Sequence, residues 1–234
     1  MKAMVFAAGR GIRLQPLTDT RPKALVEVAG RTLLEHVVRR LVDAGVTEVI
    51  INLHHLGGQI PPFLEKHNLF GLRRVAYSQE PALLDTGGGL KQAAWFFDDG
   101  NPFLVHNADV LSDIDLGGLL EAHRRSQALA TLAVLDRPTE RPLYFDADGR
   151  LVGRHTSGKG DEFVSAPHGK PVSLGFCGIQ AMSPDIFGKM SEPGAFPLAE
   201  AYLRLASAGE KILAHRVDGA KWRDCGRPED LRPL

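Results

Sequence analysis

The chain has 234 residues, of which 44% are hydrophobic, so it is long enough to bury a substantial core, and we expect one folded domain. Lys plus Arg and Asp plus Glu number 28 each, which leaves no basic excess of the kind that binding to nucleic acid or an anionic membrane needs. The two cysteines, Cys177 and Cys225, are too few for a disulfide framework and lack metal-ligand spacing, so we expect a reducing, cytoplasmic compartment.

The first element is an apolar run from Ala3 to Ala8, which predicts a buried strand. The run is too short for a signal peptide or a membrane span, so we expect no targeting segment or anchor. It changes abruptly into a loop in which Gly9 and Gly11 let backbone N–H groups approach an anion closely. Nearby positive charge comes from Arg10, Arg13 and Lys23. This combination predicts a phosphate cradle and therefore a nucleotide site.

Two better-known glycine-rich motifs do not fit this loop. The dinucleotide fingerprint needs a third glycine where the chain has Leu14, and it needs a helix that opens at the loop, against which Pro16 and Pro22 argue. The P-loop needs Gly-Lys-Ser/Thr, which is absent. For this stretch alone, an ordinary strand-to-loop turn with scattered surface cations stays open as the alternative.

Strands and helices then alternate to about residue 135. Thr32 can cap a helix from Leu33 to Ala44, with Gly45 at its end. The other elements expected are strands over 48–52, 73–78 and 102–106, a helix within 56–67 that starts at its two prolines, a helix over 88–97, and a helix over 116–125 capped by Asp115. This alternation predicts a parallel sheet covered by helices on both faces, with ligands at the carboxyl ends of the strands.

The pattern changes at Leu143 to short strands and turns, with a hairpin turn over 146–149. The segment from His155 to Lys170 is polar and rich in glycine and has no periodicity, so we expect a mobile flap that closes over a ligand. Strands are expected over 172–182, 212–217 and 221–224, with helices near 184–190 and 197–207.

Two carboxylates occupy positions suited to a metal ion. Asp109 follows an apolar strand, and Asp224 ends a second strand that Gly226 closes. Two carboxylates delivered to strand ends can share a hard cation such as Mg²⁺, which keeps several waters and takes further ligands from substrate phosphates. Each residue alone is better explained as a turn or cap, but together with the phosphate loop they favour a metal site.

The order Gly-x-Gly-x-Arg, Pro-Leu-Thr and Pro-Lys resembles the signature of the sugar-phosphate nucleotidyltransferases, which join an NTP to a sugar 1-phosphate and release pyrophosphate. The resemblance spans residues 3 to 226. It implies an α/β fold: a single Rossmann-like domain over 1–234 with a mostly parallel mixed sheet, helices on both faces and a small β sugar-binding subregion. Residues 1–140 would bind mainly the nucleotide, and 141–234 would bind mainly the sugar and supply the second metal ligand.

The same resemblance implies roles for individual residues. Lys23, Arg13 and Asp109 would be catalytic, and Asp109 and Asp224 would coordinate Mg²⁺. The nucleotide would be bound by Ala7, Ala8, Gly9, Arg10, Gly11, Arg13, Lys23, Glu80, Thr86, Gly87, Gly88, Asn107 and Asp109. The segment from Glu80 to Gly89 would act largely through its backbone. The sugar would be bound by Cys177, Gly178 and Asp224.

The short form of the chain resembles one branch of this family. Because the chain ends at Leu234, we expect no repetitive left-handed helix domain. Ala-Ala-Gly in the loop is similar to the N-acetylmuramate 1-phosphate uridylyltransferases, which implies UTP as the nucleotide. The chain departs from the family pattern at Ala24, where proline is common, and at Ala108, where glycine often precedes the metal-binding aspartate. Guanylyl or thymidylyl transfer to a mannose-, heptose- or glucose-type 1-phosphate stays open.

Several other motifs have simpler explanations. Asp113-Ile114-Asp115 suggests a glycosyltransferase that uses a nucleotide sugar, but Asp115 directly precedes a helical pattern and is better explained as its cap. His54-His55 are better explained as polar turn residues than as metal ligands, and Trp95-Phe96-Phe97 as a helix packing face. A non-catalytic nucleotide-sugar sensor is a second alternative, against which the intact set Lys23, Asp109 and Asp224 argues.

The sequence therefore predicts attack by a sugar 1-phosphate oxygen on the α-phosphorus of an NTP. The nucleophile is already an anion, so catalysis needs positioning and charge neutralisation rather than a general base. The expected partners are NTP and sugar 1-phosphate, with no nucleic acid or membrane, in a monomer or small homo-oligomer.

Overall fold

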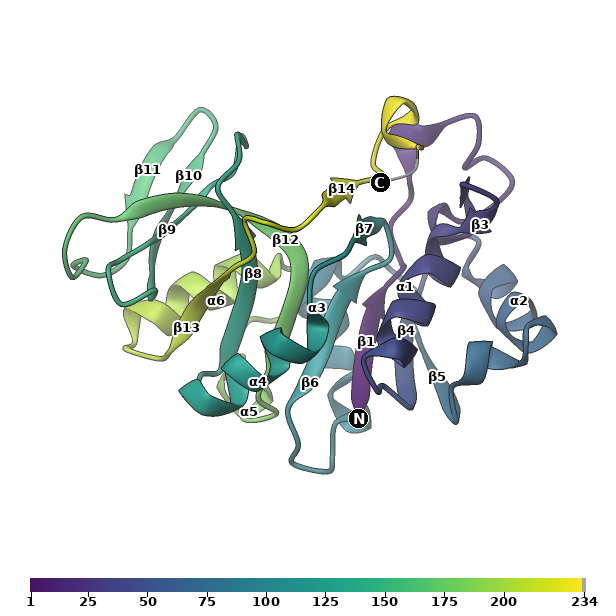
Figure 1. Ribbon diagram of the computed structural model, residues 1–234, viewed down its shortest axis with the longest axis horizontal. Helices are drawn as coiled ribbons and strands as arrows, with labels where there is room; N and C mark the ends of the chain where they lie inside the picture. Colours follow the sequence, from purple (N-terminus) through teal and green to yellow (C-terminus); the bar gives the residue numbers. More distant parts are fainter. Residues whose placement is uncertain (233–234) are drawn as a thin grey trace.

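The computed structural model describes residues 1–232, which form a twisted mixed sheet with helices on both faces (Figure 1). The strand order is β11-β10-β9-β12-β6-β1-β4-β5, and β8 pairs with β12 and β13 beside this path. The predicted fold class is confirmed. The strands are β1 (Lys2–Phe6), β2 (Glu27–Val28), β3 (Arg31–Thr32), β4 (Glu48–Leu53), β5 (Arg74–Gln79), β6 (Phe103–Asn107), β7 (Val110–Ser112), β8 (Ala130–Leu135), β9 (Leu143–Phe145), β10 (Leu151–Thr156), β11 (Gly160–Phe163), β12 (Val172–Met182), β13 (Ile212–Arg216) and β14 (Trp222–Asp224).

The helices follow the predicted pattern closely. They are α1 (Leu33–Asp43), α2 (Ile60–Lys66), α3 (Asp85–Gln92), α4 (Leu116–Ser126), α5 (Ile186–Lys189) and α6 (Leu198–Ser207). Thr32 Oγ1 accepts a hydrogen bond from the Glu35 N–H at 3.1 Å, as expected for the cap of α1. The helix expected over 88–97 begins earlier, at Asp85, and ends at Gln92 before a 3₁₀ turn over Ala94–Phe96. Within residues 1–232, no helix is long and apolar enough to cross a bilayer.

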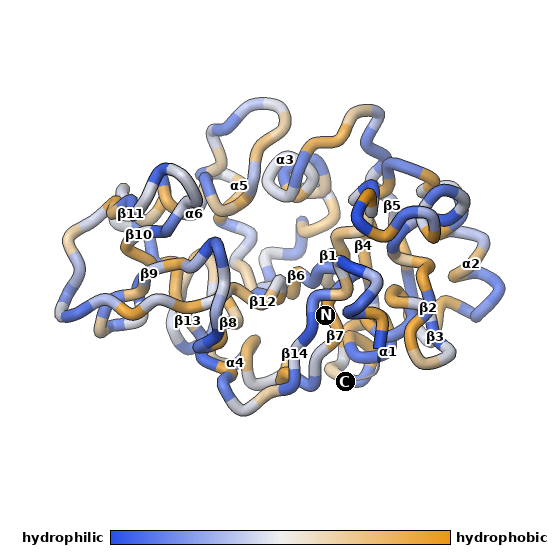
Figure 2. Tube along the Cα trace, turned by 90° about the horizontal axis from the view of Figure 1, so that it is seen from above, coloured by the Kyte–Doolittle hydropathy of each residue, from blue (hydrophilic) through white to orange (hydrophobic). Residues whose placement is uncertain are grey.

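The central strands are apolar throughout because each of their two faces is covered. In β1, Met4 belongs to the core beneath α3, α5 and α6, whereas Ala3 and Val5 belong to the core beneath α1, α2 and α4. Strands β6, β1, β4 and β5 are parallel, so their carboxyl ends meet at one edge of the sheet. Figure 2 shows hydrophilic loops around the outside of these hydrophobic strands.

The second half of the chain joins the same sheet through β12. This strand pairs with β6 and β8 along its last residues and with β9 along its first ones, all antiparallel. Its register against β8 shifts between Phe176 and Gln180, where Gly178 has a φ of +72°. The expected boundary between a nucleotide part and a sugar part at residue 140 stays a prediction, because this sheet runs through both.

The prediction of an irregular segment over 155–170 was wrong in part. Residues Gly160–Phe163 form β11, which pairs antiparallel with β10. The His155 and Tyr144 side chains both hydrogen-bond to Asp161 Oδ1, each at 2.7 Å. The sequence Gly-Asp-Glu-Phe of β11 shows no strand periodicity, because β11 lies at the edge of the sheet and most of its side chains are exposed. Closure of this hairpin over a ligand stays a prediction.

Thr32→Ala should lower the free energy of unfolding by about 1 kcal/mol, because it leaves the Glu35 N–H at the start of α1 without its cap. Urea denaturation measures this change. Thr20→Ala is the matched control, since Thr20 is an exposed loop residue whose side chain has no partner within residues 1–232, and it should stay within about 0.5 kcal/mol of wild type. Equal stability of both variants would contradict the capping role.

Candidate active site

The predicted phosphate loop follows β1 directly, at the carboxyl edge of the parallel strands. Gly11 has a φ of +66°, and a Cβ there would lie 2.8 Å from Thr18 Cγ2, so only glycine fits. The backbone N–H groups of Gly9, Arg10 and Gly11 donate to no acceptor within residues 1–232. Unpaired, exposed N–H groups of this kind can receive the oxygens of an anion.

Lys23 and Asp109 meet at this edge. Lys23 lies in a short 3₁₀ turn, Lys23–Leu25, and its Nζ forms an ion pair with Asp109 Oδ2. The Lys23 and Asp109 side chains are only 13% and 26% exposed. The structure thus brings together a cation and a carboxylate that are 86 residues apart in the chain.

Asp224 arrives beside them from the C-terminal strand. Strand β14 pairs antiparallel with β7, with Asp224 opposite Val110, and the Cys225 N–H donates to the Asp109 carbonyl at 2.8 Å. The Arg13 guanidinium passes over Gly226, where a Cβ would lie 2.6 Å from Arg13 Nη2 and 2.9 Å from Asp224 Oδ1. Four charged groups from distant parts of the chain therefore gather at one place. They are Arg13, Lys23, Asp109 and Asp224, which we call the charge cluster.

The electrostatics of the charge cluster show that the two carboxylates sense each other. The pKa of Asp224 is raised, first by partial withdrawal from bulk water and then by the negative charge of Asp109, while Lys23 and Arg13 lower it. Solvent still reaches Asp224 at the mouth of the site, so screening limits the size of this effect.

The donor set fits Mg²⁺. A magnesium site uses one or two carboxylates and fills its remaining positions with waters and substrate phosphates. Asp109 and Asp224 supply two such carboxylates beside free N–H groups that can hold the phosphates. Within residues 1–232 no group of three or more His, Cys, Asp or Glu side chains is arranged around a common metal position. The pKa of Asp224 is raised first by burial and second by the charge of Asp109, and a cation between the two aspartates would offset this second contribution.

A cleft of about 300 Å³ opens from this cluster along the strand ends. Five predicted nucleotide-binding residues are among those that line it. The lining residues are Phe6, Ala8, Gly9, Asn52, Leu83, Asp85, Thr86, Asn107 and Asp109. A smaller hollow of about 40 Å³ adjoins it and is lined in part by Ala7 and Lys23. The cleft thus lies where the strand order predicts a ligand.

The Glu80 side chain is buried behind the cleft, and the expected contact of this residue with a nucleotide stays a prediction. Its side chain is only 1% exposed, its Oε1 accepts from Asn52 Nδ2 at 2.7 Å, and its Oε2 accepts from the Leu84 N–H at 3.0 Å. Asn52 Oδ1 in turn accepts from the Ala7 N–H at 2.8 Å. Glu80 therefore positions the cleft wall and the phosphate loop from behind. Sequence reasoning missed Asn52, although an asparagine inside the apolar strand β4 was a usable signal.

Gly87 and Gly88 are also turned away from the cleft. The Gly87 N–H donates to the Phe196 carbonyl at 2.9 Å, and a Cβ on Gly87 would lie 2.2 Å from the Phe196 ring. A Cβ on Gly88 would lie 2.5 Å from the Gly194 carbonyl oxygen. These glycines therefore allow close packing of α3 against the 194–196 loop, and their contact with a nucleotide stays a prediction. Thr86 does line the cleft.

The contacts expected between a sugar and the Cys177–Gly178 segment stay predictions. The Cys177 side chain is fully buried in the core, and burial raises its pKa to about 12, so its thiol does not face a ligand. Its carbonyl instead accepts a hydrogen bond from Trp222 Nε1 at 2.8 Å. Gly178 packs against Asn107, where a Cβ would lie 2.7 Å from Asn107 Nδ2.

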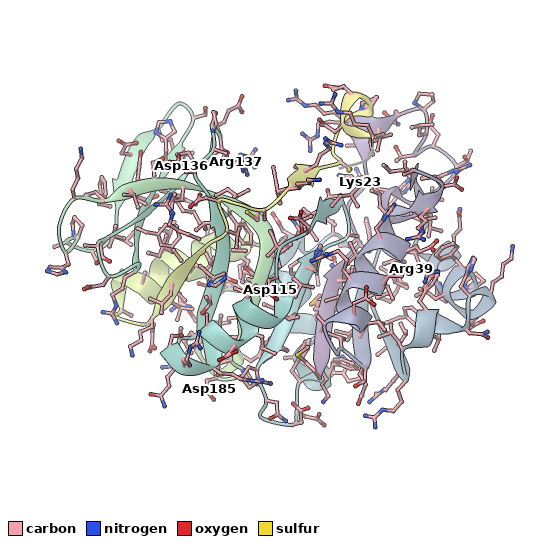
Figure 3. All side chains as sticks on the ribbon, viewed as in Figure 1. Lys23, Arg39, Asp115, Asp136, Arg137 and Asp185 are labelled. Carbon is pink, nitrogen blue, oxygen red and sulfur yellow. The ribbon has the colours of Figure 1, made fainter. Side chains whose placement is uncertain are left out.

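A second, wider cleft of about 1050 Å³ begins at Arg13 and Asp224 and extends to the loop after β8. Figure 3 shows Arg137 on the β8 side of this region and Lys23 on the opposite side. Arg137, which sequence analysis did not single out, lines this cleft. The full lining is Arg13, Arg137, Pro138, Thr139, Glu140, Arg141, Trp222, Arg223, Asp224, Arg227, Glu229 and Asp230.

The motifs that were assigned structural roles have them. Asp115 Oδ1 accepts from the Gly118 N–H at 2.9 Å and so caps α4, and Asp113 Oδ1 accepts from the Lys221 N–H at 2.7 Å. His54 Nδ1 lies 2.9 Å from the Glu80 carbonyl oxygen. Phe96 and Phe97 are buried, but Trp95 is 54% exposed, so the aromatic triplet is only in part a packing face.

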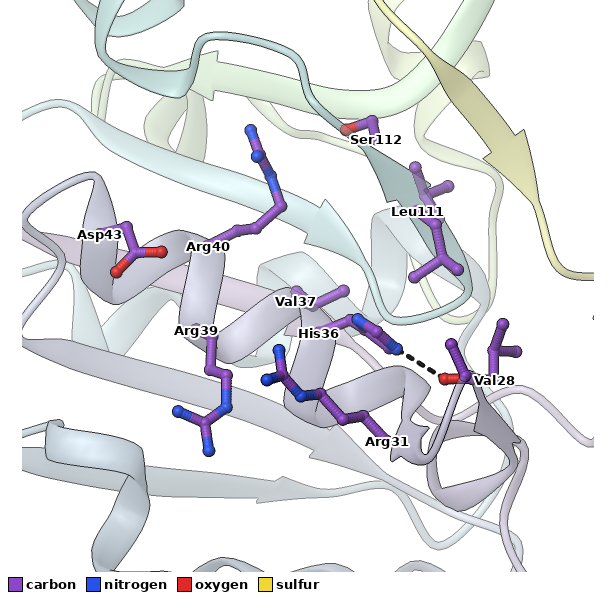
Figure 4. Close-up of a pocket in the computed structure, with 11 residues that line it drawn as sticks. Val28, Arg31, His36, Val37, Arg39, Arg40, Asp43, Leu111 and Ser112 are labelled. Carbon is purple, nitrogen blue, oxygen red and sulfur yellow. Dashed lines mark hydrogen bonds between the residues drawn. The ribbon is translucent and has the colours of Figure 1, made fainter. Parts of the chain in front are cut away.

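A separate hollow of about 270 Å³ lies between α1 and β7 (Figure 4). Arg31, Arg39 and Arg40 line it, and His36 bonds the Val28 carbonyl at 2.9 Å. None of the predicted nucleotide, sugar or metal residues lines this hollow, so it is distinct from the candidate active site.

Comparison with known proteins places the chain in a family. A model of the nucleotidyl transferase family matches residues 2–233, and the chain belongs to this family. It is a sugar 1-phosphate nucleotidyltransferase, as the motif order predicted.

Particular relatives are similar over nearly the whole chain. The N-acetylmuramate alpha-1-phosphate uridylyltransferase of Neisseria meningitidis serogroup B is 37% identical over 97% of this chain and 93% of its own. The enzyme of the same name from Caulobacter vibrioides is 32% identical over 97% of this chain and 92% of its own. A solved structure of UDP-glucose pyrophosphorylase from Acinetobacter baumannii has the same fold, with a TM-score of 0.78, 22% identity, and coverage of 98% of this chain and 90% of that one.

Asp224→Asn should raise the melting temperature at pH 7.5 without divalent cations, because it removes a negative charge that Asp109 and burial disfavour. The folded-state pKa lies above the ordinary 3.8, so the carboxyl favours folding at low pH and disfavours it as the pH rises through that pKa. The difference from wild type should therefore shrink as the pH falls toward 4.

Differential scanning calorimetry across pH provides this measurement, with Asp113→Asn as the matched control. Asparagine at 113 keeps the oxygen that accepts from the Lys221 N–H, so this variant should show no comparable gain at pH 7.5. A lower melting temperature for Asp224→Asn at pH 7.5 would mean that the Asp224 carboxylate supports the fold rather than a ligand site.

Proposed function

We propose that this enzyme transfers a uridylyl group from UTP to N-acetylmuramate 1-phosphate and releases pyrophosphate. The choice of base and sugar is supported by two relatives of that activity, which are 37% and 32% identical over nearly full length. We also propose a cytoplasmic monomer or small homo-oligomer, without nucleic-acid or membrane partners, which is supported by the balanced charge of the chain.

The charge cluster is the observation that supports this site most strongly. Arg13 and Lys23 lie beside two carboxylates and next to the N–H groups of Gly9 to Gly11, which have no acceptor among the described residues 1–232. Such an arrangement suits two phosphate-bearing substrates and a divalent cation, whose charges it balances. The 300 Å³ cleft on one side suits the nucleoside, and the wider cleft at Asp224 suits the sugar.

The proposed reaction is an in-line displacement. A sugar 1-phosphate oxygen forms a bond to the α-phosphorus, and the bond from that phosphorus to the bridging oxygen of the β-phosphate breaks. The electron pair of that bond leaves with pyrophosphate, so the reaction is balanced without a general base. Lys23, Arg13 and the loop N–H groups hold the phosphates in line and neutralise the charge on the leaving group.

Asp109 and Asp224 would hold Mg²⁺, which when bound supplies charge neutralisation and orientation for the phosphates. Until then the Lys23 ammonium pairs with Asp109. When the substrates bind, the Lys23 ammonium would move from the carboxylate to a phosphate oxygen. Its charge would then act on the phosphates, which it does not do in the free enzyme.

The substrate proposal predicts one dominant pair in a matrix of UTP, GTP, dTTP and ATP against 1-phosphates of N-acetylmuramate, N-acetylglucosamine, mannose and glucose. UTP with N-acetylmuramate 1-phosphate should give the highest kcat/KM, measured as pyrophosphate released in the presence of Mg²⁺. A preference for GTP with mannose 1-phosphate would replace the proposed substrates, and release of free nucleoside diphosphate from a nucleotide sugar would indicate a glycosyltransferase instead.

Lys23→Ala should lower kcat about a hundredfold or more while weakening UTP affinity much less, since its charge should matter most as pyrophosphate departs. Lys23→Arg should not restore kcat, because a planar guanidinium cannot occupy the position of a compact ammonium in this tight contact. Steady-state kinetics and UTP titration calorimetry separate the two effects. Equal losses in kcat and affinity would make Lys23 a binding residue only.

A further inference from the structure

We infer that Arg137 binds a carboxylate carried by the sugar substrate and so selects N-acetylmuramate 1-phosphate over N-acetylglucosamine 1-phosphate. This inference rests on the proposed function. The two sugars differ by the lactyl ether on O3 of N-acetylmuramate, which adds one carboxylate. An enzyme that distinguishes them needs a fixed cation at the sugar end of its site.

Arg137 is held in place without a carboxylate of its own. Its guanidinium lies 4.1 Å from the centroid of the Trp222 ring, and its Nη2 donates to the Phe176 carbonyl at 2.9 Å. A second, weaker contact joins Nη1 to the Pro138 carbonyl at 3.4 Å. Within residues 1–232 no carboxylate lies within ion-pair distance of Arg137. A cation that is fixed but unpaired, at the edge of a cleft, is ready for an anionic ligand.

The surroundings of Arg137 are built to accommodate its guanidinium. A Cβ on Gly175 would lie 2.8 Å from Arg137 Nε, so the guanidinium occupies a slot between this glycine and Trp222. Trp222 is itself fixed by its hydrogen bond to the Cys177 carbonyl. Two of the five N–H donors of Arg137 reach backbone carbonyls, and its Nε is buried without a partner.

Strand β14 sets the distance between Arg137, which stacks on Trp222, and the proposed phosphate positions at Asp224. Trp222 and Asp224 are two residues apart on one strand, so their side chains point to the same face, roughly 7 Å apart. Asp224 belongs to the charge cluster, where the phosphates are proposed to lie. A group that contacts the Arg137 guanidinium is therefore about one sugar ring away from the reacting phosphate, which is where a substituent on the sugar extends.

A carboxylate fits this site better than a further phosphate does. Arg13 and Lys23 already face the phosphate positions, and a planar guanidinium matches a carboxylate with two parallel hydrogen bonds. Arg141 adds positive charge to the same cleft, whereas Glu140 disfavours anions at its rim. The pairing with Trp222 weakens hydration of the guanidinium, so a bound carboxylate meets less competition from water.

The test measures KM and kcat for both sugars with Arg137→Met, at saturating UTP and Mg²⁺. Methionine keeps much of the apolar length between Gly175 and Trp222. The KM for N-acetylmuramate 1-phosphate should rise about 10- to 100-fold, the value of a charge-assisted hydrogen bond, while that for N-acetylglucosamine 1-phosphate should stay within about threefold. Melting temperature and the KM for UTP should stay close to wild type.

Three further measurements test whether the effect comes from the charge of the carboxylate and from Arg137. The primary amide of the lactyl group has nearly the size of the carboxylate but no charge, so wild type should bind this amide as poorly as Arg137→Met binds the acid. Arg137→Lys should recover little of the preference, because an ammonium lacks the planar fork. Arg141→Met, which removes another cation from the same cleft, is the matched control and should change both KM values alike.

The outcomes separate the two proposals. A wild-type enzyme that prefers N-acetylmuramate 1-phosphate, with an Arg137→Met variant that keeps this preference, would overturn the carboxylate contact alone. Equal losses for both sugars in the variant would show that Arg137 contacts a phosphate or only supports Trp222, which also overturns the contact. A wild-type enzyme that prefers a sugar 1-phosphate without a carboxylate would overturn both proposals.

Discussion

The proposed function depends on four charges that the fold brings from three distant segments to one edge of the sheet. Arg13 and Lys23 follow β1, Asp109 follows β6, and Asp224 ends β14. Burial first and the negative charge of Asp109 second raise the pKa of Asp224, and the two cations only partly offset this rise. Such a cluster lowers the stability of the free protein. A bound cation with phosphate ligands would make use of the cluster.

The framework behind the charge cluster makes this arrangement possible. Parallel strands β1, β4 and β6 end together, and the buried series Glu80, Asn52 and Ala7 ties the ends of two of them to the wall of the cleft. Strand β14 then returns the C-terminal segment against β7, which places the Cys225 N–H on the Asp109 carbonyl. The phosphate loop extends beyond the last strand pair, and its N–H groups therefore have no backbone acceptor within the part of the chain that the structure describes.

Local patterns in the sequence predict the elements and the charge cluster well. Apolar runs that end before Gly9 and Asp109 mark strand ends, and Thr32 and Asp115 mark helix starts with side chains that do cap them. Local patterns miss contacts in which a residue's partner is distant in the chain. Glu80 binds Asn52 and Leu84, and Gly87 packs on Phe196, so both support the cleft from behind. Arg137 has no local signal, because its position depends on Gly175 and Trp222.

The most direct measurement of the central claim is a crystal structure with UTP and Mn²⁺ in place of Mg²⁺, with the metal located by anomalous scattering. We predict a metal bonded to both Asp109 and Asp224 and to a phosphate oxygen, with Lys23 moved from Asp109 to a phosphate and the uridine beside Thr86. A metal bound away from both aspartates, or a nucleotide outside the cleft that Asn52 and Thr86 line, would contradict the account.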